Sequence, residues 1–311
     1  MRTIDKPRHR SLDVNGIEVF YREAGSADKP CVLLLHGFPS SSHTFRHVLS
    51  PLARVSRVIA PDLPGFGFSA APAPGEYDYT FAGLADTIEA FLDRAGVEEF
   101  FVYLHDFGAP VGYHLATRRP ERILGLIVQN GNAHEDGLGS QWDTARAYWA
   151  DPSEANRARL PEWLNFEGTR EQYLGGLPER LRPLQPPEPW HLDWERMSRP
   201  GNIEIQFRLF RDYAAHVARF GELADYHRAH QPPCLLLWGR HDPFFDLAEI
   251  MAYARALDRL EMHVYDAGHF LLETHSPECA ERIAAFVADV TAERAVAYGA
   301  DGHRRGTALA R

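Results

Sequence analysis

One aspartate lies where the chain is expected to change from strand to helix by a sharp turn. Asp106 stands in the segment FFVYLHDFGAP, in which an apolar run ends at Leu104 and a helical pattern begins after Gly108. This is the setting of a nucleophile elbow, with Asp106 in the serine position of G-x-S-x-G. Such a turn exposes the carboxylate beside a helix N-terminus, where backbone N–H groups favour negative charge. Aspartate is also a good helix N-cap, so this motif alone does not separate catalysis from capping.

Three further motifs, each directly after a predicted strand, favour the catalytic interpretation. His36–Pro39 (HGFP) follows an early apolar run and can supply backbone N–H groups to an oxyanion hole. Asp242, in WGRHD, follows a later run and offers an acid, and His269, in DAGHF, follows the last run and offers a base. The order nucleophile, acid, histidine is one of the orders in which catalytic triads occur along a chain.

With these motifs, the chain resembles the α/β-hydrolase superfamily over nearly its whole length. HGFP, HDFG and GRHD look most like the epoxide hydrolase and haloalkane dehalogenase branch. The resemblance implies that Asp106 is the nucleophile, His269 the general base and Asp242 the acid that orients it. It also implies an oxyanion hole made by the backbone N–H groups of Phe38 and Phe107.

A carboxylate nucleophile implies attack at a saturated carbon. A serine would be left as an ether there, which water does not readily cleave, whereas an aspartate forms an ester. Water activated by His269 can hydrolyse that ester at the carboxyl carbon of Asp106, while the oxyanion hole holds the developing charge. This chemistry implies two substrate classes, epoxides and compounds with a carbon–halogen bond.

The leaving group of an epoxide is an alkoxide, which needs an acid. Related hydrolases supply that acid with tyrosines of the cap. Tyr213 is the first candidate, although its place four residues after Leu209 also fits a core aromatic. Tyr148 and Tyr173 are candidates for a second tyrosine.

Halide release instead needs hydrogen-bond donors for an anion. Haloalkane dehalogenases typically have tryptophan after the nucleophile and often asparagine in the HGxP loop, but this chain has Phe107 and Phe38, whose side chains cannot donate. The first hypothesis is therefore an epoxide hydrolase that forms a vicinal diol, and the alternative is a haloalkane or haloacid dehalogenase. Two hypotheses of another class are a non-hydrolytic lyase or cyclase of the same fold and a ligand-binding protein.

Short apolar runs alternate with helical patterns, which predicts an α/β fold with a mostly parallel, doubly wound sheet. The predicted strands are Ser11–Val14, Ile17–Arg22, Cys31–His36, Arg57–Pro61, Phe100–Leu104, Ile123–Gln129, Cys234–Gly239 and Glu261–Tyr265. The predicted helices are Ser42–Ala53, Thr80–Ala95, Phe107–Arg118, Asp246–Leu257 and Pro277–Ala292. Asn15-Gly16 suits a tight hairpin turn between the first two strands.

In residues 131–230 the alternation of apolar runs and helical patterns stops. This predicts a helical cap inserted into a hydrolase core of residues 1–130 and 231–295. Five of the six tryptophans lie in this insertion, which would cover the carboxyl edge of the sheet, where open α/β sheets bind ligands. We expect a small apolar substrate there, although the same rings would also suit the core of the cap itself. The residues expected to contact the substrate are His36, Trp142, Tyr148, Trp149 and Tyr173. Residues 296–311 lack periodicity and are expected to form a disordered tail.

Two positions of the elbow depart from the pattern of the superfamily. Leu104 occupies a position where glycine is usual, and Ala109 replaces a further common glycine. We expect looser packing nearby to absorb the bulk of Leu104.

The composition narrows the partners and the compartment. A formal net charge of −10 argues against nucleic acid, because binding to phosphates needs clustered Lys and Arg. The apolar runs are too short to cross a bilayer and the first ten residues contain no apolar stretch, so we expect a cytoplasmic protein without membrane contact. No histidine spacing matches a metal motif, so neither a metal nor another cofactor is expected. A homodimer is compatible with the sequence.

Overall fold

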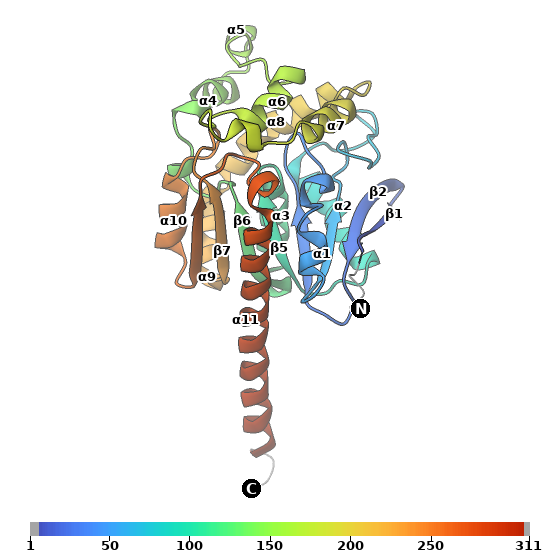
Figure 1. Cartoon of the computed structure of the whole chain (residues 1–311), viewed down its shortest axis with the longest axis vertical. Helices are drawn as coiled ribbons and strands as arrows, with labels where there is room; N and C mark the ends of the chain where they lie inside the picture. The colour runs from blue at the N-terminus through green and yellow to red at the C-terminus, as the bar shows by residue number, and fades with distance from the viewer. Residues whose placement is uncertain (1–5, 308–311) are drawn as a thin grey trace.

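A sheet of eight strands forms the centre of the computed structural model, which describes residues 6–307 (Figure 1). The strands are β1 (Arg8–Val14), β2 (Ile17–Ala24), β3 (Cys31–Leu35), β4 (Arg57–Pro61), β5 (Phe100–His105), β6 (Ile123–Gln129), β7 (Cys234–Gly239) and β8 (Leu260–Tyr265). They lie in the order β1-β2-β4-β3-β5-β6-β7-β8. The pairs β1–β2 and β2–β4 are antiparallel, and every later pair is parallel, so the predicted fold class is confirmed.

The apolar runs were sufficient to place the strands. Arg57–Pro61, Ile123–Gln129 and Cys234–Gly239 have the predicted bounds, and the others differ by a few residues at their ends. Asn15 and Gly16 both have positive φ, at 54° and 87°, as a two-residue hairpin turn of the predicted kind requires.

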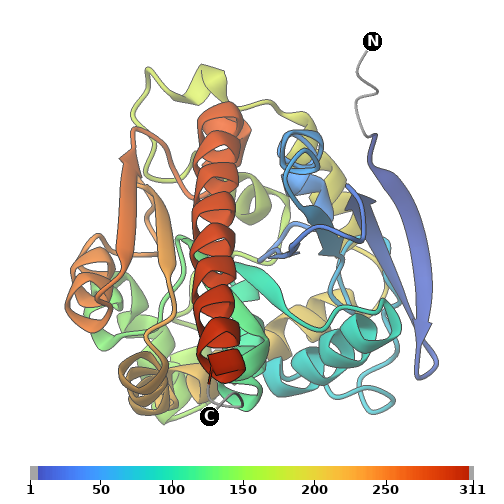
Figure 2. The same cartoon turned by 90° about the horizontal axis from the view of Figure 1, so that it is seen from below.

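Helices cover both faces of the sheet (Figure 2). The short α1 (Leu49–Leu52) and the long α11 (Leu272–Thr307) pack on one face. The other face carries α2 (Phe81–Arg94), α3 (Gly108–Arg118), α9 (Phe220–His230) and α10 (Ala248–Ala256). A 3-10 turn, Ser42–Phe45, precedes α1, and a second one, Pro120–Arg122, precedes β6.

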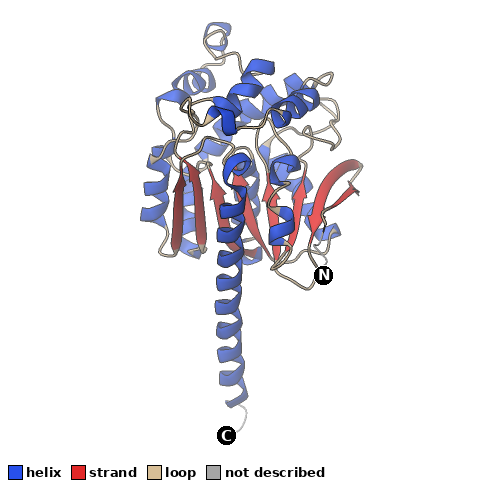
Figure 3. Ribbon diagram, in the orientation of Figure 1, coloured by secondary structure: helices blue, strands red, loops and turns tan. Residues whose placement is uncertain are grey.

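A cap of helices lies above the carboxyl ends of the parallel strands (Figure 3). It comprises α4 (Asp143–Ala150), α5 (Glu154–Arg157), α6 (Phe166–Leu174), α7 (Glu188–Met197) and α8 (Asn202–Ala218), with 3-10 turns at Glu135–Gly137, Ser140–Trp142 and Arg182–Leu184. The last part of the predicted insertion differs, because α9 returns to the sheet and packs against α3 and α10. It therefore acts as the connecting helix between β6 and β7.

The C-terminal helix is longer than the sequence pattern suggested. α11 continues to Thr307 and projects well below the sheet in Figure 1, where we expected a tail without structure from residue 296. Once a helix has begun, each added residue gains a hydrogen bond, and no proline follows Pro277 to stop it. Residues 308–311 lie outside the described part. Within residues 6–307, no helix is both long enough and apolar enough to cross a membrane.

Candidate active site

The turn after β5 holds Asp106 in an unusual backbone conformation. Its φ is +49°, in the left-handed region that aspartate tolerates better than most residues. Two glycines make room for this turn: a Cβ at Gly37 would overlap the Asp106 side chain, and a Cβ at Gly108 would overlap the carbonyl of Leu35. The carboxylate is thereby carried over the end of the sheet, and only 8% of Asp106 is exposed.

The bulk of Leu104 is absorbed by a glycine rather than by loose packing. A Cβ at Gly112, one turn into α3, would overlap the Leu104 side chain, which is completely buried. Gly131 similarly leaves space for the methyl group of Ala109. The expectation of loose packing is therefore wrong: the glycine missing from the strand is replaced by glycines on the elements that pack against it.

Two backbone N–H groups point at the carboxylate of Asp106 itself. The N–H groups of Phe38 and Phe107 each donate to Asp106 Oδ1 at 2.6 Å. The other oxygen, Oδ2, lies 3.8 Å from His269 Nε2. Burial raises the pKa of Asp106, while the nearby His269 and the two N–H donors act in the opposite direction.

His269 is oriented by Asp242. Its Nδ1 lies 2.7 Å from Asp242 Oδ2, and the other oxygen of Asp242 accepts the backbone N–H groups of Phe244 and Phe245 at 2.7 and 3.3 Å. This arrangement leaves Nε2 directed toward Asp106. Burial lowers the pKa of His269, but the charge and hydrogen bond of Asp242, together with the charge of Asp106, outweigh burial and leave that pKa raised.

Rings on several sides fix the position of the imidazole. Phe245 stacks on His269 at 5.5 Å between ring centres, and His105 lies at 4.6 Å from another side. Gln129 donates its side-chain N–H to the backbone carbonyl of His269 and accepts Tyr103 O–H on its side-chain oxygen. His105 contacts the ring from within the fold, and burial holds its pKa well below the ordinary value, so it is a neutral packing partner.

A cavity of about 290 Å³ opens above Asp106. Its lining residues are Phe38, Asp106, Phe107, Gln141, Trp142, Thr144, Ala145, Leu160, Pro161, Trp163, Gln172, Phe210, Pro243, Phe244 and Phe245. Asp106 is the one ionisable side chain among them. A cavity with apolar walls and a few polar groups is typical of sites for small apolar molecules.

The structure brings some of the predicted residues to this cavity. Phe38, Phe107 and Trp142 line it, and the indole N–H of Trp142 donates to the carbonyl of Phe244 at 2.7 Å. Trp142 therefore helps to hold the loop that carries Asp242.

Tyr213 packs directly behind this wall instead of lining the cavity. Its ring stacks on Trp142 at 5.0 Å, and no part of the residue is exposed. The hydroxyl has no hydrogen-bond partner in the described part of the chain. Burial, followed by the charge of Asp106, raises the pKa of Tyr213 well above its ordinary value.

Two residues predicted to contact the substrate have structural partners instead. His36 accepts the backbone N–H of Leu63 on Nε2, and its Nδ1 lies 3.0 Å from the carbonyl of Gly37, which fixes the HGFP loop. Tyr173 donates its hydroxyl to Asp193 and stacks on Phe270 at 3.9 Å. The structure thus corrects both predictions, because the side chains of His36 and Tyr173 are held by hydrogen bonds and ring contacts within the fold.

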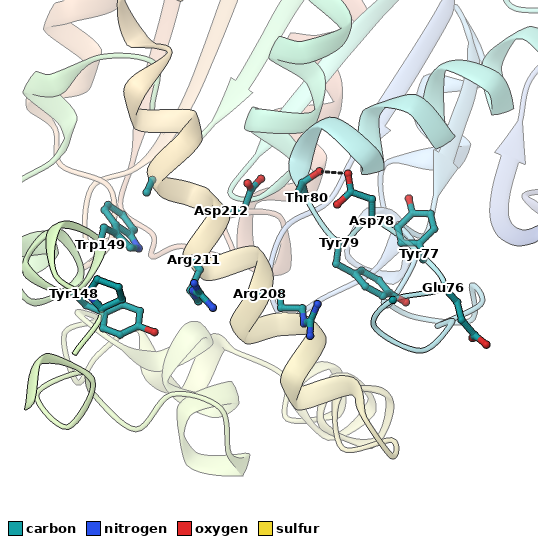
Figure 4. Close-up of a pocket in the computed structure, with 13 residues that line it drawn as sticks. Glu76, Tyr77, Asp78, Tyr79, Thr80, Tyr148, Trp149, Arg208, Arg211 and Asp212 are labelled. Carbon is teal, nitrogen blue, oxygen red and sulfur yellow. Dashed lines mark hydrogen bonds between the residues drawn. The ribbon is translucent and has the colours of Figure 1, made fainter. Parts of the chain in front are cut away.

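Tyr148 and Trp149 face a separate groove on the outside of the cap, shown in Figure 4. The groove measures about 650 Å³ and lies between α4, α8 and the loop before α2. Arg208, Arg211 and Asp212 of α8 also line it. The prediction that Tyr148 and Trp149 contact a substrate above Asp106 is therefore not met, since α4 turns them to the other side.

Several lining residues were missed by the sequence reasoning. Trp163 lies at 4.9 Å from the ring of Phe38, and Gln172 of α6 reaches the cavity beside it. Phe244 and Phe245 could have been found from the sequence, because they follow the acid Asp242 within three positions. Trp163 and Gln172 carry no comparable signal, because Trp163 lies in the irregular segment before α6 and the direction of Gln172 depends on how α6 packs.

The fold and this geometry agree with a comparison against known protein families. A family described as "alpha/beta hydrolase fold" matches residues 30–276, well over half of the chain. The chain belongs to the α/β-hydrolase family. An uncharacterized hydrolase of Saccharomyces cerevisiae is 38% identical over 286 residues, which cover 90% of this chain and 97% of that protein.

Relatives named for two activities match a shorter part of the chain. A haloalkane dehalogenase of Bradyrhizobium diazoefficiens is 40% identical over 117 residues, or 38% of this chain and 37% of the dehalogenase. An epoxide hydrolase of Siraitia grosvenorii is 36% identical over 125 residues, or 40% of this chain and 39% of that enzyme. The predicted resemblance to this branch is confirmed, and the chain is a hydrolase by family.

Solved structures of both kinds share the fold. The epoxide hydrolase CorEH superposes with a TM-score of 0.72 at 22% identity, covering 92% of this chain and 100% of that one. A haloalkane dehalogenase from Bradyrhizobium elkanii gives 0.71 at 24% identity, covering 93% and 100%. At these identities the likeness concerns the fold alone.

Proposed function

We propose that this hydrolase attacks a saturated carbon with Asp106 Oδ2 and forms a covalent ester on that side chain. The observation that carries the proposal is the direction of the oxyanion donors. In a serine hydrolase such donors must point at the carbonyl of the substrate, but here the N–H groups of Phe38 and Phe107 converge on Asp106 Oδ1. They suit hydrolysis at the carboxyl carbon of Asp106, where charge develops on that oxygen.

The second step requires a base that can reach water next to the ester. His269 Nε2 is 3.8 Å from Asp106 Oδ2 and has no hydrogen-bond partner in the described part of the chain, so it is free to accept a proton from water next to the ester. Asp242 stabilises the imidazolium that forms when His269 accepts a proton. The ester then breaks and releases the alcohol, and Asp106 is restored with an oxygen atom from water.

His269→Asn tests both steps at once. Without the base, alkylation of Asp106 should proceed and hydrolysis should stall, so intact-mass analysis should show an adduct of the substrate mass. Styrene oxide and 1-bromobutane serve as parallel probes of the two substrate classes. An active wild type with no adduct on the variant would contradict the two-step mechanism, whereas a wild type that turns over neither probe would favour a non-hydrolytic or ligand-binding role.

An epoxide is the first substrate class, because an unpaired acid lies behind the cavity wall, with its ring 6.0 Å from that of Phe107. The Tyr213 hydroxyl is buried without a hydrogen bond in residues 6–307, which is costly unless the group has a function. Burial, followed by the charge of Asp106, raises the pKa of this hydroxyl, so it keeps its proton until an acceptor reaches it. Donation to the ring oxygen requires the rings of Trp142 or Phe107 to move aside when the substrate binds, and the product is a vicinal diol.

An alkyl halide is the second class, favoured by the donors that line the cavity. Trp163, Gln172 and Thr144 can give hydrogen bonds but no proton at neutral pH. A halide leaves as a stable anion and needs only such hydrogen bonds, whereas an alkoxide needs a proton. Release of free halide at an efficiency comparable with epoxide opening would place this class first.

A further inference from the structure

A glutamine of the cap lines the cavity above Asp106 without making a hydrogen bond. Gln172, on α6, is 8% exposed, and its carboxamide has no hydrogen-bond partner within residues 6–307. Its polar atoms are nevertheless not sealed from solvent, as the side-chain oxygens of Gln185 and Gln206 are. The donor and the acceptor of this mostly buried side chain are therefore both open to a molecule in the cavity.

The packing of α6 fixes the direction of this side chain. The next residue, Tyr173, stacks on Phe270 at 3.9 Å between ring centres and donates its hydroxyl to Asp193. Phe270 directly follows His269 in the chain. Because a rotation of α6 about its axis would break these contacts, Gln172 is held in place relative to His269.

The first turn of α6 brings an aromatic wall to the same side. Asn165 caps the helix by accepting the N–H of Gly168 at 2.7 Å, and a Cβ at Gly168 would overlap the backbone carbonyl of Trp163. Gln172 lies four residues after Gly168, and residues at this spacing share one face of a helix. Trp163, whose ring lies 4.9 Å from that of Phe38, therefore packs on the face of α6 that also carries Gln172.

The rest of the lining decides which groups the carboxamide can meet. Asp106 is the one ionisable residue among the lining residues, and none of them is a cation. Moving a charged group from water into such a cavity is costly unless an opposite charge is there to pair with it. An anionic group would find no such charge, and a cationic group would pair with Asp106 and block the nucleophile. The group that suits Gln172 is therefore uncharged.

A mostly buried carboxamide needs hydrogen bonds, because polar groups removed from water are costly when they stay unpaired. Water can supply these bonds while no substrate is bound. A substrate that displaces this water loses affinity unless it replaces the hydrogen bonds, and an apolar substrate cannot replace them. Gln172 should therefore discriminate between substrates that have the same shape and differ in one polar group.

We propose that Gln172 is a specificity-determining residue that binds a carboxamide group on an aryl substrate; as a statement about substrates this rests on the proposed epoxide hydrolysis. A second carboxamide matches Gln172 best, because two such groups can exchange two hydrogen bonds in one plane. The aryl body of the substrate packs against rings such as those of Phe38 and Trp163. Gln172 selects the epoxide that is accepted and takes no part in the proton transfers of the reaction.

The test is the selectivity between two substrates of the same shape. Styrene oxides that carry a carboxamide or an isopropyl group at the same ring position, meta or para, differ in hydrogen bonding but little in size. Gln172→Met keeps the length of the side chain but cannot donate a hydrogen bond. The ratio of kcat/KM, carboxamide over isopropyl, should fall by about 10–100-fold in this variant at one or both ring positions, the loss expected for an unpaired polar group. Electronic effects of the substituents cancel, because both proteins are compared on the same two compounds.

Gln141→Met is the matched control. Gln141 also lines the cavity, but it is exposed, and its carboxamide donates to the carbonyl of Phe244 at 3.2 Å. This variant should keep the wild-type ratio. Equal losses on both compounds in Gln172→Met would leave the ratio unchanged at either ring position. That result would overturn the proposal, because it would give Gln172 a role that does not depend on the carboxamide.

Binding of compounds that cannot react separates this proposal from the proposed function. Benzamide and isopropylbenzene carry the same two groups without an epoxide, and calorimetry should show the ratio of their affinities falling in Gln172→Met as the kinetic ratio does. If the wild type hydrolyses no epoxide while this ratio falls, recognition by Gln172 stands and the epoxide mechanism is wrong. If epoxides are hydrolysed and neither ratio changes, the mechanism stands and Gln172 has no role in specificity.

Discussion

The cavity above Asp106 and the groove of Figure 4 are bordered by the same two cap helices, yet their chemistry is opposite. In the cavity, α4 and α8 contribute Ala145 and Phe210, and Asp106 is the one ionisable lining residue. In the groove, α4 contributes Trp149, one turn after Ala145, and α8 contributes Arg211, the position after Phe210, beside several charged and hydroxyl groups. The helix α8 therefore has an apolar side toward Asp106 and a charged side toward the groove, whereas α4 lines the cavity with its first turn and the groove with its last.

This difference explains why the cavity is better suited than the groove to the proposed reaction. Electrostatic interactions are stronger where water is excluded, so the N–H donors at Asp106 and the Asp242 carboxylate act with little screening. The exposed charges of the groove, such as Arg211, are solvated and weakly coupled. Size alone would have pointed to the wrong place, since the groove is the larger of the two.

Removal of the carboxylate should have the largest effect and should separate the two regions most clearly. Asp106→Asn should lower kcat/KM by about 10⁴–10⁶-fold, because a missing nucleophile eliminates the covalent step. Asp212→Asn, in the groove, keeps the oxygen that accepts the N–H of Phe81 and should leave activity unchanged. Steady-state assays of both purified variants are sufficient, and similar losses in the two would remove the distinction between cavity and groove.

Two of the cap tyrosines, Tyr213 and Tyr148, give the next largest contrast. Tyr213→Phe should slow alkylation of Asp106 by an epoxide by about 10²–10⁴-fold, because the proton donor is lost while the ring packing remains. Alkylation by an alkyl halide and hydrolysis of a preformed ester should barely change. Tyr148→Phe, in the groove, should match the wild type on every substrate. Single-turnover mass measurements that find equal epoxide rates for wild type and Tyr213→Phe would exclude Tyr213 from the mechanism.

The pH dependence should report the buried imidazole. His269 must be neutral to accept a proton from water, and its pKa is raised above the ordinary 6.5. Ester hydrolysis should therefore slow as pH falls, about tenfold per unit, starting above pH 6.5. Asp242→Asn should shift this fall in rate to lower pH, since it removes the charge that raises the pKa of His269. A rate that begins to fall only below pH 6.5 in the wild type would contradict the role proposed for Asp242.

The smallest effect concerns the packing beneath the nucleophile. Gly112→Ala should destabilise the fold by about 1–3 kcal/mol, because the new methyl group would overlap Leu104 in a filled core. Gly221→Ala is the control in α9: nothing lies within 4 Å of its Cβ position, and alanine in a helix should stabilise by about 0.5–1 kcal/mol. Urea unfolding measures both, and an unchanged midpoint for Gly112→Ala would show that the core beneath Asp106 can relax.

The sequence by itself was sufficient for the sheet and for the residues around Asp106. Strand bounds such as Ile123–Gln129 follow from short apolar runs, because strands buried on both faces must be apolar throughout. Asp106, Asp242 and His269 could be selected because each directly follows such a run, and parallel strands bring their carboxyl ends to one edge of the sheet. Backbone donors at Phe38 and Phe107 follow from the same local turns.

Only the tertiary structure decided which cap residues meet the nucleophile. The sequence does not distinguish Trp142 from Tyr148 and Trp149, yet Trp142, at the end of the 3-10 turn before α4, lines the cavity, whereas α4 carries the other two to the groove. Tyr213 is separated from the cavity by the ring of Trp142, which no periodicity encodes. An amphipathic helix with two buried or half-buried sides has no single apolar stripe, so its direction is set by its neighbours rather than by its own sequence.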